Sequence, residues 1–237
     1  MRIPFIAGNW KMFKTVQEAV FFTKELRIVV KDIDDVEIVV APPFTAIHAV
    51  AEAARNSRIG VAGQDLYWEH EGAFTGEISA PMLRELGVYG AIVGHSERRQ
   101  YFGETDDTVA KRAEAALAAG LSVIACVGET EAERESGLTE EVLRRQVSVF
   151  GEDDNLVIAY EPVWAIGTGK TATPELAQQA HAFIKGLLDA PVLYGGSVKP
   201  DNAADLLAQP DVDGALVGGA SLDPDSFSAI CRAATAS

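Results

Sequence analysis

A lone carboxylate at the start of a glycine-containing loop is the most informative chemical pattern in the sequence. Glu161 directly follows the apolar run 156–160 and directly precedes Pro162. Because the run reads as a buried strand and proline ends strand pairing, we expect Glu161 at a strand's carboxyl end, aimed into a cavity. The loop 163–170 carries glycines and large apolar side chains, so it could close over that cavity and exclude water. The pattern predicts a general base beneath a lid, and a surface connection with a chance glutamate is the alternative.

Other polar and glycine residues also stand directly after apolar runs. These segments are 8–11 (Gly-Asn-Trp-Lys), 94–99 (Gly-His-Ser-Glu-Arg-Arg), 195–197 (Gly-Gly-Ser) and 218–221 (Gly-Gly-Ala-Ser). None is decisive alone, since a histidine after a strand is usually structural and a Gly-Gly pair is usually a turn. However, glycine-rich loops after the last two strands of an α/β barrel present backbone N–H groups to a phosphate. The shared position of the segments indicates a site for a small phosphate ester.

The elements that must position these residues recur along the whole chain. Short β-rich runs at 5–7, 36–41, 59–62, 91–93, 123–127, 156–160, 192–194 and 215–217 alternate with segments of helical spacing such as 15–30, 105–119, 174–188 and 201–207. Thr15 and Glu18 form a capping box at one helix start. Buried strands that alternate with helices pair in parallel, as an open doubly wound sheet or a closed barrel. About eight βα units and the absence of a linker favour one domain, residues 1–237, folded as a (β/α)8 TIM barrel with an outer ring of helices.

Composition limits which binding partners and which cellular compartment we expect. The net charge is −15, from 20 Lys and Arg against 35 Asp and Glu, which argues against nucleic acid or an anionic membrane as partner. An anionic substrate therefore needs local positive potential, for which Lys11 and backbone N–H groups are the candidates. No apolar segment has the length of a membrane span, and the two cysteines, Cys126 and Cys231, are too few for a disulfide framework. We expect a cytoplasmic protein.

The chain resembles the triosephosphate isomerase family over essentially its whole length. The resemblance rests on segments 7–12, 72–77, 93–99, 159–170, 194–198 and 213–222. It implies an enzyme that interconverts D-glyceraldehyde 3-phosphate and dihydroxyacetone phosphate through an enediolate, in glycolysis and gluconeogenesis. Such proton transfer needs a base beside carbon and donors at the developing oxyanion, and it needs neither a metal nor a cofactor.

The resemblance also implies a role for each site residue. Glu161 is the base, and His95 is a neutral electrophile whose pKa the start of a helix lowers. Lys11 and Asn9 contact the substrate. The phosphate would be held by the backbone N–H groups of Gly167, Ser197, Gly218 and Gly219, and the site would be supported by Glu97 and Cys126.

Thr75 and its flanking glycines resemble the family's interface loop, which packs beside Asn9 and Lys11 of a neighbouring subunit. This implies a homodimer. An ordinary exposed loop is the alternative, although Phe74 would then be an unusual apolar exposure.

Some features depart from the family or leave other functions open. Phe13 stands where the family usually carries a small polar residue. The connections 150–156 and 188–192 look shorter than is usual in the family, and both connections would lie at the amino end of the barrel. Another phosphate-binding barrel enzyme would share the last two glycine loops without needing Asn9, Lys11, His95 and Glu161 together. A non-catalytic scaffold could retain the fold.

Overall fold

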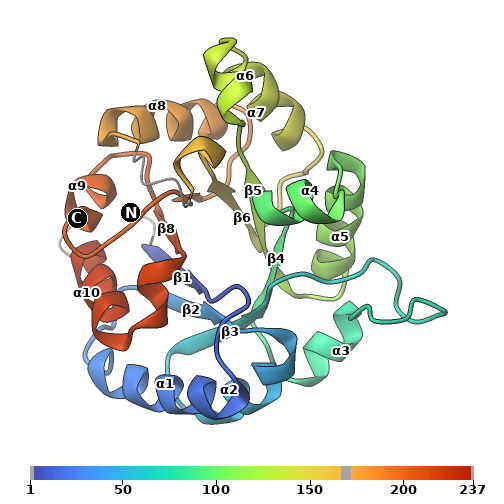
Figure 1. Ribbon diagram of the computed structural model, residues 1–237, viewed down its shortest axis with the longest axis vertical. Coiled ribbons are helices and arrows are strands. Elements are labelled where there is room, and N and C mark those ends of the chain that lie inside the picture. The colour runs from blue at the N-terminus through green and yellow to red at the C-terminus, as the bar shows by residue number, and fades with distance from the viewer. Residues whose placement is uncertain (1–2, 167–171, 236–237) are drawn as a thin grey trace.

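The strands close into one barrel surrounded by helices, as Figure 1 shows for a computed structural model of the chain. The structure describes residues 3–166 and 172–235. Each strand pairs in parallel with the next, and β1 pairs with β8, which completes the ring. The predicted (β/α)8 barrel is confirmed, and the open doubly wound sheet is excluded.

The strands lie close to the apolar runs in the sequence. They are β1 (Phe5–Asn9), β2 (Glu37–Ala41), β3 (Ile59–Gly63), β4 (Gly90–Val93), β5 (Ser122–Val127), β6 (Leu156–Tyr160), β7 (Val192–Tyr194) and β8 (Gly214–Val217). Nearly every strand residue is buried, because a parallel barrel covers both faces of its sheet. Burial on both faces is the reason that each strand reads as a continuous apolar run.

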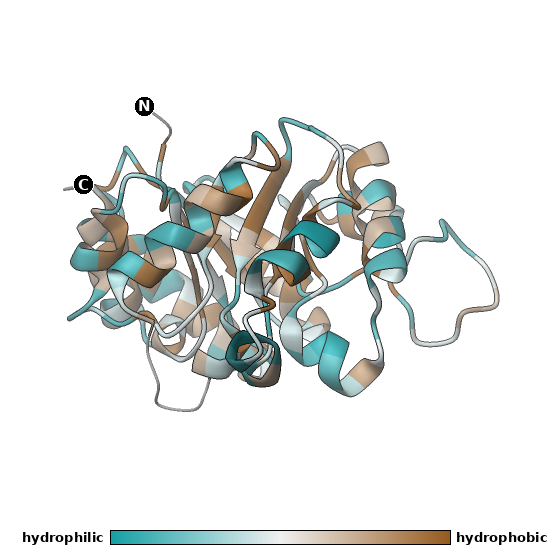
Figure 2. Cartoon of the chain, turned by 90° about the horizontal axis from the view of Figure 1, so that it is seen from above, coloured by the Kyte–Doolittle hydropathy of each residue, from teal (hydrophilic) through white to brown (hydrophobic). Residues whose placement is uncertain are grey.

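The helices form the outer ring. They are α1 (Val16–Val29), α2 (Ile47–Ala54), α3 (Ala80–Glu85), α4 (Ser96–Phe102), α5 (Asp106–Ala118), α6 (Glu131–Glu135), α7 (Thr139–Val147), α8 (Pro174–Lys185), α9 (Ala203–Leu207) and α10 (Pro224–Thr235). Figure 2 shows their mixed hydropathy, with polar residues interspersed among apolar ones. The capping box of Thr15 and Glu18 at the start of α1 is confirmed. In the described parts of the chain, no helix has the length and apolar character needed to cross a bilayer.

Two hydrophobic layers result from the alternation of side chains along each strand. One cluster consists of strand residues, such as Ala7, Ile124 and Leu216, and fills the barrel interior. The other joins the intervening strand residues, such as Ile6 and Val40, to the buried faces of the helices. Cys126 and Cys231 are both buried and free of disulfides.

The connections at the two ends of the barrel differ in character. The short connections 150–156 and 188–192 precede β6 and β7, at the amino end, as expected. The loop between β3 and α3 extends away from the barrel, drawn in teal in Figure 1 and visible again in Figure 2. It carries Thr75 at an exposed position.

Candidate active site

A cavity of about 240 Å³ lies at the carboxyl ends of the strands. It brings together the predicted residues Asn9, Lys11, His95, Glu161, Ser197, Gly218 and Gly219, which come from the ends of β1, β4, β6, β7 and β8. Gly167, the remaining predicted phosphate contact, lies outside the described residues. No group of three or more His, Cys, Asp or Glu side chains in the described part of the chain is arranged to hold a metal ion.

Glu161 lies between two glycines, Gly128 and Gly195, that directly follow the neighbouring strands β5 and β7. Its N–H donates to the Val127 carbonyl over 2.7 Å, which continues the pairing of β5 with β6 by one residue. A Cβ added to Gly128 would lie 1.7 Å from the Glu161 carbonyl oxygen, and one added to Gly195 would lie 2.9 Å from Glu161 Cγ. Both flanking positions must therefore lack a side chain for Glu161 to sit where it does.

The carboxylate of Glu161 is 2% exposed and fully engaged by polar partners. Oε1 lies 2.9 Å from His95 Nε2, and Oε2 accepts a hydrogen bond of 2.8 Å from the Ser96 N–H. Burial alone raises the pKa of Glu161, but His95 and the Ser96 N–H outweigh burial and place the pKa below its ordinary value. The structure therefore holds Glu161 as a carboxylate.

His95 is the N-cap of α4, where its ring is held in one tautomer. Nδ1 accepts from the Glu97 N–H over 3.2 Å, so the ring hydrogen belongs on Nε2, which faces Glu161. Burial favours the uncharged ring, but the Glu161 carboxylate raises the pKa of His95 above its ordinary value. The expected lowering is therefore wrong for this arrangement, because Glu161 lies beside the ring. Protonation of Nδ1 would still cost the bond to the helix start.

Lys11 follows β1 in a backbone conformation with φ of 51°, which non-glycine residues rarely adopt. Its N–H donates to Asn9 Oδ1 over 3.0 Å, and its carbonyl accepts from Gln64 Nε2 over 2.9 Å. The ammonium Nζ lies 2.6 Å from Glu97 Oε1. These contacts aim the ammonium across the cavity mouth toward α4, and they place Glu97 beside both Lys11 and His95.

The loops after β7 and β8 form the opposite wall of the cavity. The space beside Gly219 is open, and a Cβ at Gly218 would contact Lys11 Cε at 3.7 Å. A ligand in this part of the cavity would thus lie between backbone amides and the Lys11 side chain. Lys199, which was not predicted as a site residue, also lines the cavity.

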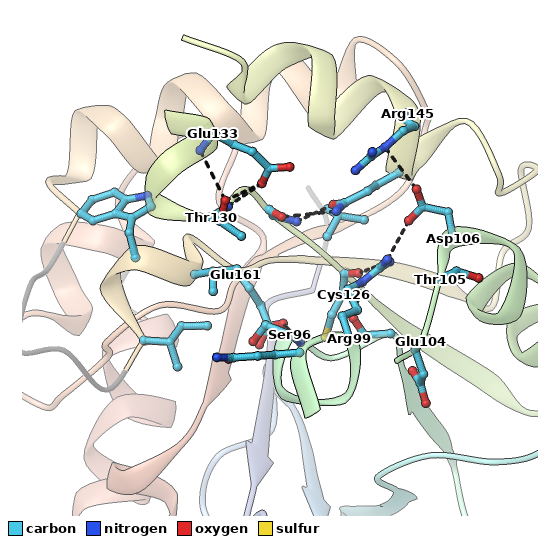
Figure 3. Close-up of a pocket in the computed structure, with 18 of the residues that line it drawn as sticks. Ser96, Arg99, Glu104, Thr105, Asp106, Cys126, Thr130, Glu133, Arg145 and Glu161 are labelled. Atoms are coloured by element: carbon cyan, nitrogen blue, oxygen red, sulfur yellow. Dashed lines mark hydrogen bonds and ion pairs between the residues drawn. The ribbon is translucent and has the colours of Figure 1, made fainter. Parts of the chain in front are cut away.

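A larger cavity of about 790 Å³ lies on the other side of Glu161 and includes residues of α4, α6 and α7 in its lining. Figure 3 shows its charged wall, where Asp106 pairs with Arg99 at 2.6 Å and with Arg145 at 3.2 Å. Cys126 also lines it, and burial, followed by the nearby Glu161 carboxylate, raises the pKa of its thiol well above the ordinary value. Cys126 is therefore an unreactive neighbour of Glu161 rather than a nucleophile.

A buried carboxylate anchors the start of the loop that follows Glu161. Glu129 accepts hydrogen bonds from Trp164 Nε1 at 3.0 Å and from the Tyr160 hydroxyl at 3.1 Å. Arg134 lies 3.2 Å from the same carboxylate, and its guanidinium stands over the Trp164 ring. Glu129 was not predicted from the sequence, although it lies two residues after β5, among the residues that follow the strands directly.

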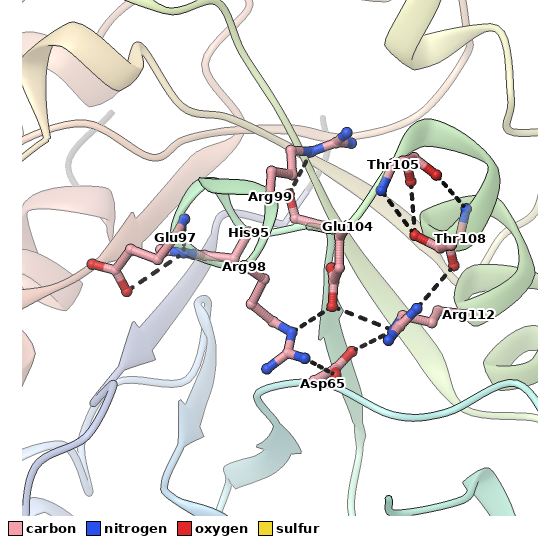
Figure 4. Close-up of polar contacts among 10 residues, drawn as sticks. Asp65, His95, Glu97, Arg98, Arg99, Glu104, Thr105, Thr108 and Arg112 are labelled. Carbon is pink, nitrogen blue, oxygen red and sulfur yellow. Dashed lines mark hydrogen bonds and ion pairs between the residues drawn. The ribbon is translucent and has the colours of Figure 1, made fainter. Parts of the chain in front are cut away.

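A second buried ionic cluster joins the protruding loop to α4 and α5. As Figure 4 shows, Asp65 contacts Arg98 at 2.8 Å and Arg112 at 3.0 Å, and both arginines also contact Glu104. Burial, together with the Glu104 charge, raises the pKa of Asp65 to about 6. Further out on the loop, the ring of Phe74 packs at 4.7 Å from that of Tyr67 and remains 40% exposed.

Comparison with known proteins agrees with this geometry. The family model described as triosephosphate isomerase matches residues 4–234. Triosephosphate isomerase of Trichlorobacter lovleyi is 55% identical, with 98% of this chain and 99% of that protein covered. Triosephosphate isomerase of Moorella thermoacetica is 56% identical, with 97% and 98% covered. The similarity therefore spans every element of the barrel.

Proposed function

The chain belongs to the triosephosphate isomerase family, and we propose a role for each residue of its site in the reaction. The enzyme interconverts D-glyceraldehyde 3-phosphate and dihydroxyacetone phosphate, a step of glycolysis and gluconeogenesis. The observation that carries the assignment of roles is one cavity of about 240 Å³ that joins a buried carboxylate, an imidazole, an ammonium and two glycine-rich loops. The full-length family match also argues against other phosphate-binding barrel enzymes and a non-catalytic scaffold.

Glu161 is the base that moves the proton between adjacent carbons. Its carboxylate is ionised but held by His95 and Ser96, so it must turn away from both to reach a substrate carbon. Closure of the following loop would remove water, and a carboxylate in a dry site is a stronger base. The hydrogen bond from the Glu161 N–H to the Val127 carbonyl and the close approach of Gly128 hold its backbone while the side chain moves.

His95 stabilises the charge that develops on the substrate oxygens. Nε2–H donates to the oxyanion of the enediolate, and the neutral ring can accept a proton as it gives one. Once Glu161 turns to the substrate, the contact that raises the pKa of His95 is lost. The Glu97 N–H then favours the uncharged ring.

Lys11 supplies the positive charge that an anionic substrate needs on a chain of net charge −15. The phosphate would lie at Ser197, Gly218 and Gly219, within reach of Lys11, with Gly167 as a further predicted contact. Lys11→Met is expected to lower kcat/KM by about 100- to 1000-fold. Lys24→Met, on the exposed face of α1, changes net charge equally and should leave kcat/KM within about twofold. Equal effects of the two substitutions on kcat/KM would contradict the role of Lys11 in the site.

We also propose a homodimer in which the Thr75 loop of one subunit packs near Asn9 and Lys11 of the other. The protruding loop with its half-exposed Phe74 supports this, as does Met12, which follows Lys11 and is 94% exposed. Symmetric dimers are the commonest assemblies of soluble proteins. Sedimentation should show a dimer at micromolar concentration, and a monomer alone would contradict the proposal.

We further propose that residues 1–237 act as a single catalytic domain in the cytoplasm, without nucleic acid or membrane partners. The uninterrupted barrel, the free cysteines and the acidic charge support this.

A further inference from the structure

A buried amide holds the peptide that directly follows β5. Gln146 of α7 is only 5% exposed, and its Oε1 accepts a hydrogen bond of 2.7 Å from the Gly128 N–H. Its Nε2 donates to the Gly128 carbonyl over 3.3 Å. One side chain therefore satisfies both backbone groups of Gly128, as a neighbouring strand would do.

Gly128 lies directly against the backbone of Glu161, the proposed catalytic base. Gly128 lies so close to Glu161 that an added Cβ would be 1.7 Å from the Glu161 carbonyl oxygen. Val127, one residue earlier, accepts the Glu161 N–H over 2.7 Å. A shift of Gly128 would therefore move Glu161 by direct contact, and such contacts leave little room for compensation.

The surroundings of Gln146 do not otherwise call for an amide. Its neighbours on the same face of α7 are the buried Val142, Leu143 and Val147, where an apolar side chain would pack without desolvation cost. Gln146 lines the larger cavity of about 790 Å³ and is absent from the lining of the 240 Å³ cavity that would hold the substrate. Its polar groups are thus used on Gly128 and not on a ligand.

We propose that Gln146 is a positioning residue for Glu161, acting through Gly128. This rests on the proposed function of Glu161 as the base. Proton abstraction requires the carboxylate at a fixed distance from a substrate carbon, and a displacement of about 1 Å can cost about 100-fold in rate. Gln146 holds the backbone of Glu161 in place while the Glu161 side chain moves between His95 and the substrate.

The test replaces Gln146 by Met, which has similar length and cannot make either bond. We expect kcat to fall about 10- to 100-fold per folded enzyme, with KM within about twofold, because the phosphate loops are not touched. The deuterium isotope effect on kcat with glyceraldehyde 3-phosphate labelled at C2 should increase, since slower proton abstraction becomes more rate-limiting. A variant that merely contains fewer folded molecules would keep the wild-type isotope effect.

Gln178→Met is the matched control. Gln178 of α8 likewise binds one residue through both ends of its amide, since it accepts from the Asp211 N–H over 3.0 Å and donates to the Asp211 carboxylate, ahead of β8 at the opposite end of the barrel. It should leave kcat and the isotope effect unchanged. If Gln146→Met fails to fold, Gln146→Asn is tested in its place, because it carries the same amide on a shorter side chain. It should likewise lower kcat and increase the isotope effect while KM stays within about twofold.

The proposal is overturned if Gln146→Met or Gln146→Asn matches Gln178→Met, or if KM alone rises. It is also overturned if kcat falls with an unchanged isotope effect. A wild-type enzyme without turnover would instead contradict the proposed function, so the two failures are distinguishable.

Discussion

Glu161 and His95 hydrogen-bond each other, with 2.9 Å between Oε1 and Nε2. The proposed reaction uses both groups on the substrate, Glu161 at carbon and His95 at oxygen, so this bond must break when substrate enters. The bond from the Ser96 N–H to the other oxygen of Glu161 must break as well. The described site is therefore a resting arrangement in which the catalytic groups satisfy each other.

His95→Asn separates the catalytic role of His95 from its structural one. Asparagine is a good N-cap, so the Glu97 N–H keeps an acceptor and α4 keeps its start. The shorter side chain cannot reach the substrate oxygens, and kcat should fall by about 100- to 1000-fold. Steady-state kinetics and thermal unfolding test this together. Loss of activity that only follows loss of folded protein would contradict the role.

Shortening the loop over the site should change the products rather than only the rate. Ile166 lines both cavities, and removal of residues 166–168 would leave the enediolate open to water. An exposed enediolate can expel its phosphate and form methylglyoxal. We expect more methylglyoxal per turnover, measured by trapping the aldehyde. A product ratio equal to that of the unchanged chain would mean that this loop is not the lid.

Gly128→Ala tests the close contact with Glu161 directly. The added methyl would overlap the Glu161 carbonyl, so the free energy of unfolding should fall by about 1 to 3 kcal/mol, and kcat should fall with it. Gly151→Ala is the control, because a Cβ there meets nothing within 4 Å and its φ is ordinary. The control should be neutral or slightly stabilising. Chemical denaturation gives the free energy of unfolding of the two variants, and steady-state kinetics give their kcat. Equal values for Gly128→Ala and Gly151→Ala would contradict the close contact with Glu161.

The strands were predictable because a barrel strand is buried on both faces and ends in glycine or polar residues. The starts of α1 and α5 were predictable for a local reason, since Thr15 and Thr105 cap their own helices. The residues that contact the substrate in the proposed mechanism could also be predicted, because they follow strands directly and match a family pattern.

The supporting residues could not be predicted in the same way. Gln146 reads as one polar residue on an amphipathic helix, and its partner Gly128 reads as a turn. Their contact depends on the packing of α7 against β5, which no local pattern encodes. The left-handed φ of Lys11 depends likewise on acceptors and donors distant in sequence, such as Gln64.

Asp65 should make stability depend on pH between about 4 and 6. Its folded pKa of about 6 exceeds the ordinary 3.8, so the folded chain binds this proton more tightly than the unfolded chain. The stabilisation is therefore complete below the unfolded pKa and is lost as pH rises through 6. Relative to Asp65→Asn, the wild type should gain about 2 kcal/mol as pH falls from about 7 to 4. Denaturation curves at several pH values give the free energy of unfolding of both proteins. The same pH dependence for the wild type and Asp65→Asn would contradict this prediction.

Glu161 is proposed as the base of an isomerisation that proceeds without a metal. The most direct measurement is turnover of glyceraldehyde 3-phosphate to dihydroxyacetone phosphate by the purified chain, coupled to NADH oxidation with a chelator present. Glu161→Gln, which keeps the size of the side chain and loses its charge, is measured beside it. We expect fast turnover by the wild type and a loss of at least about 1000-fold in the folded variant. Substantial turnover by Glu161→Gln, or none by the folded wild type, would contradict it.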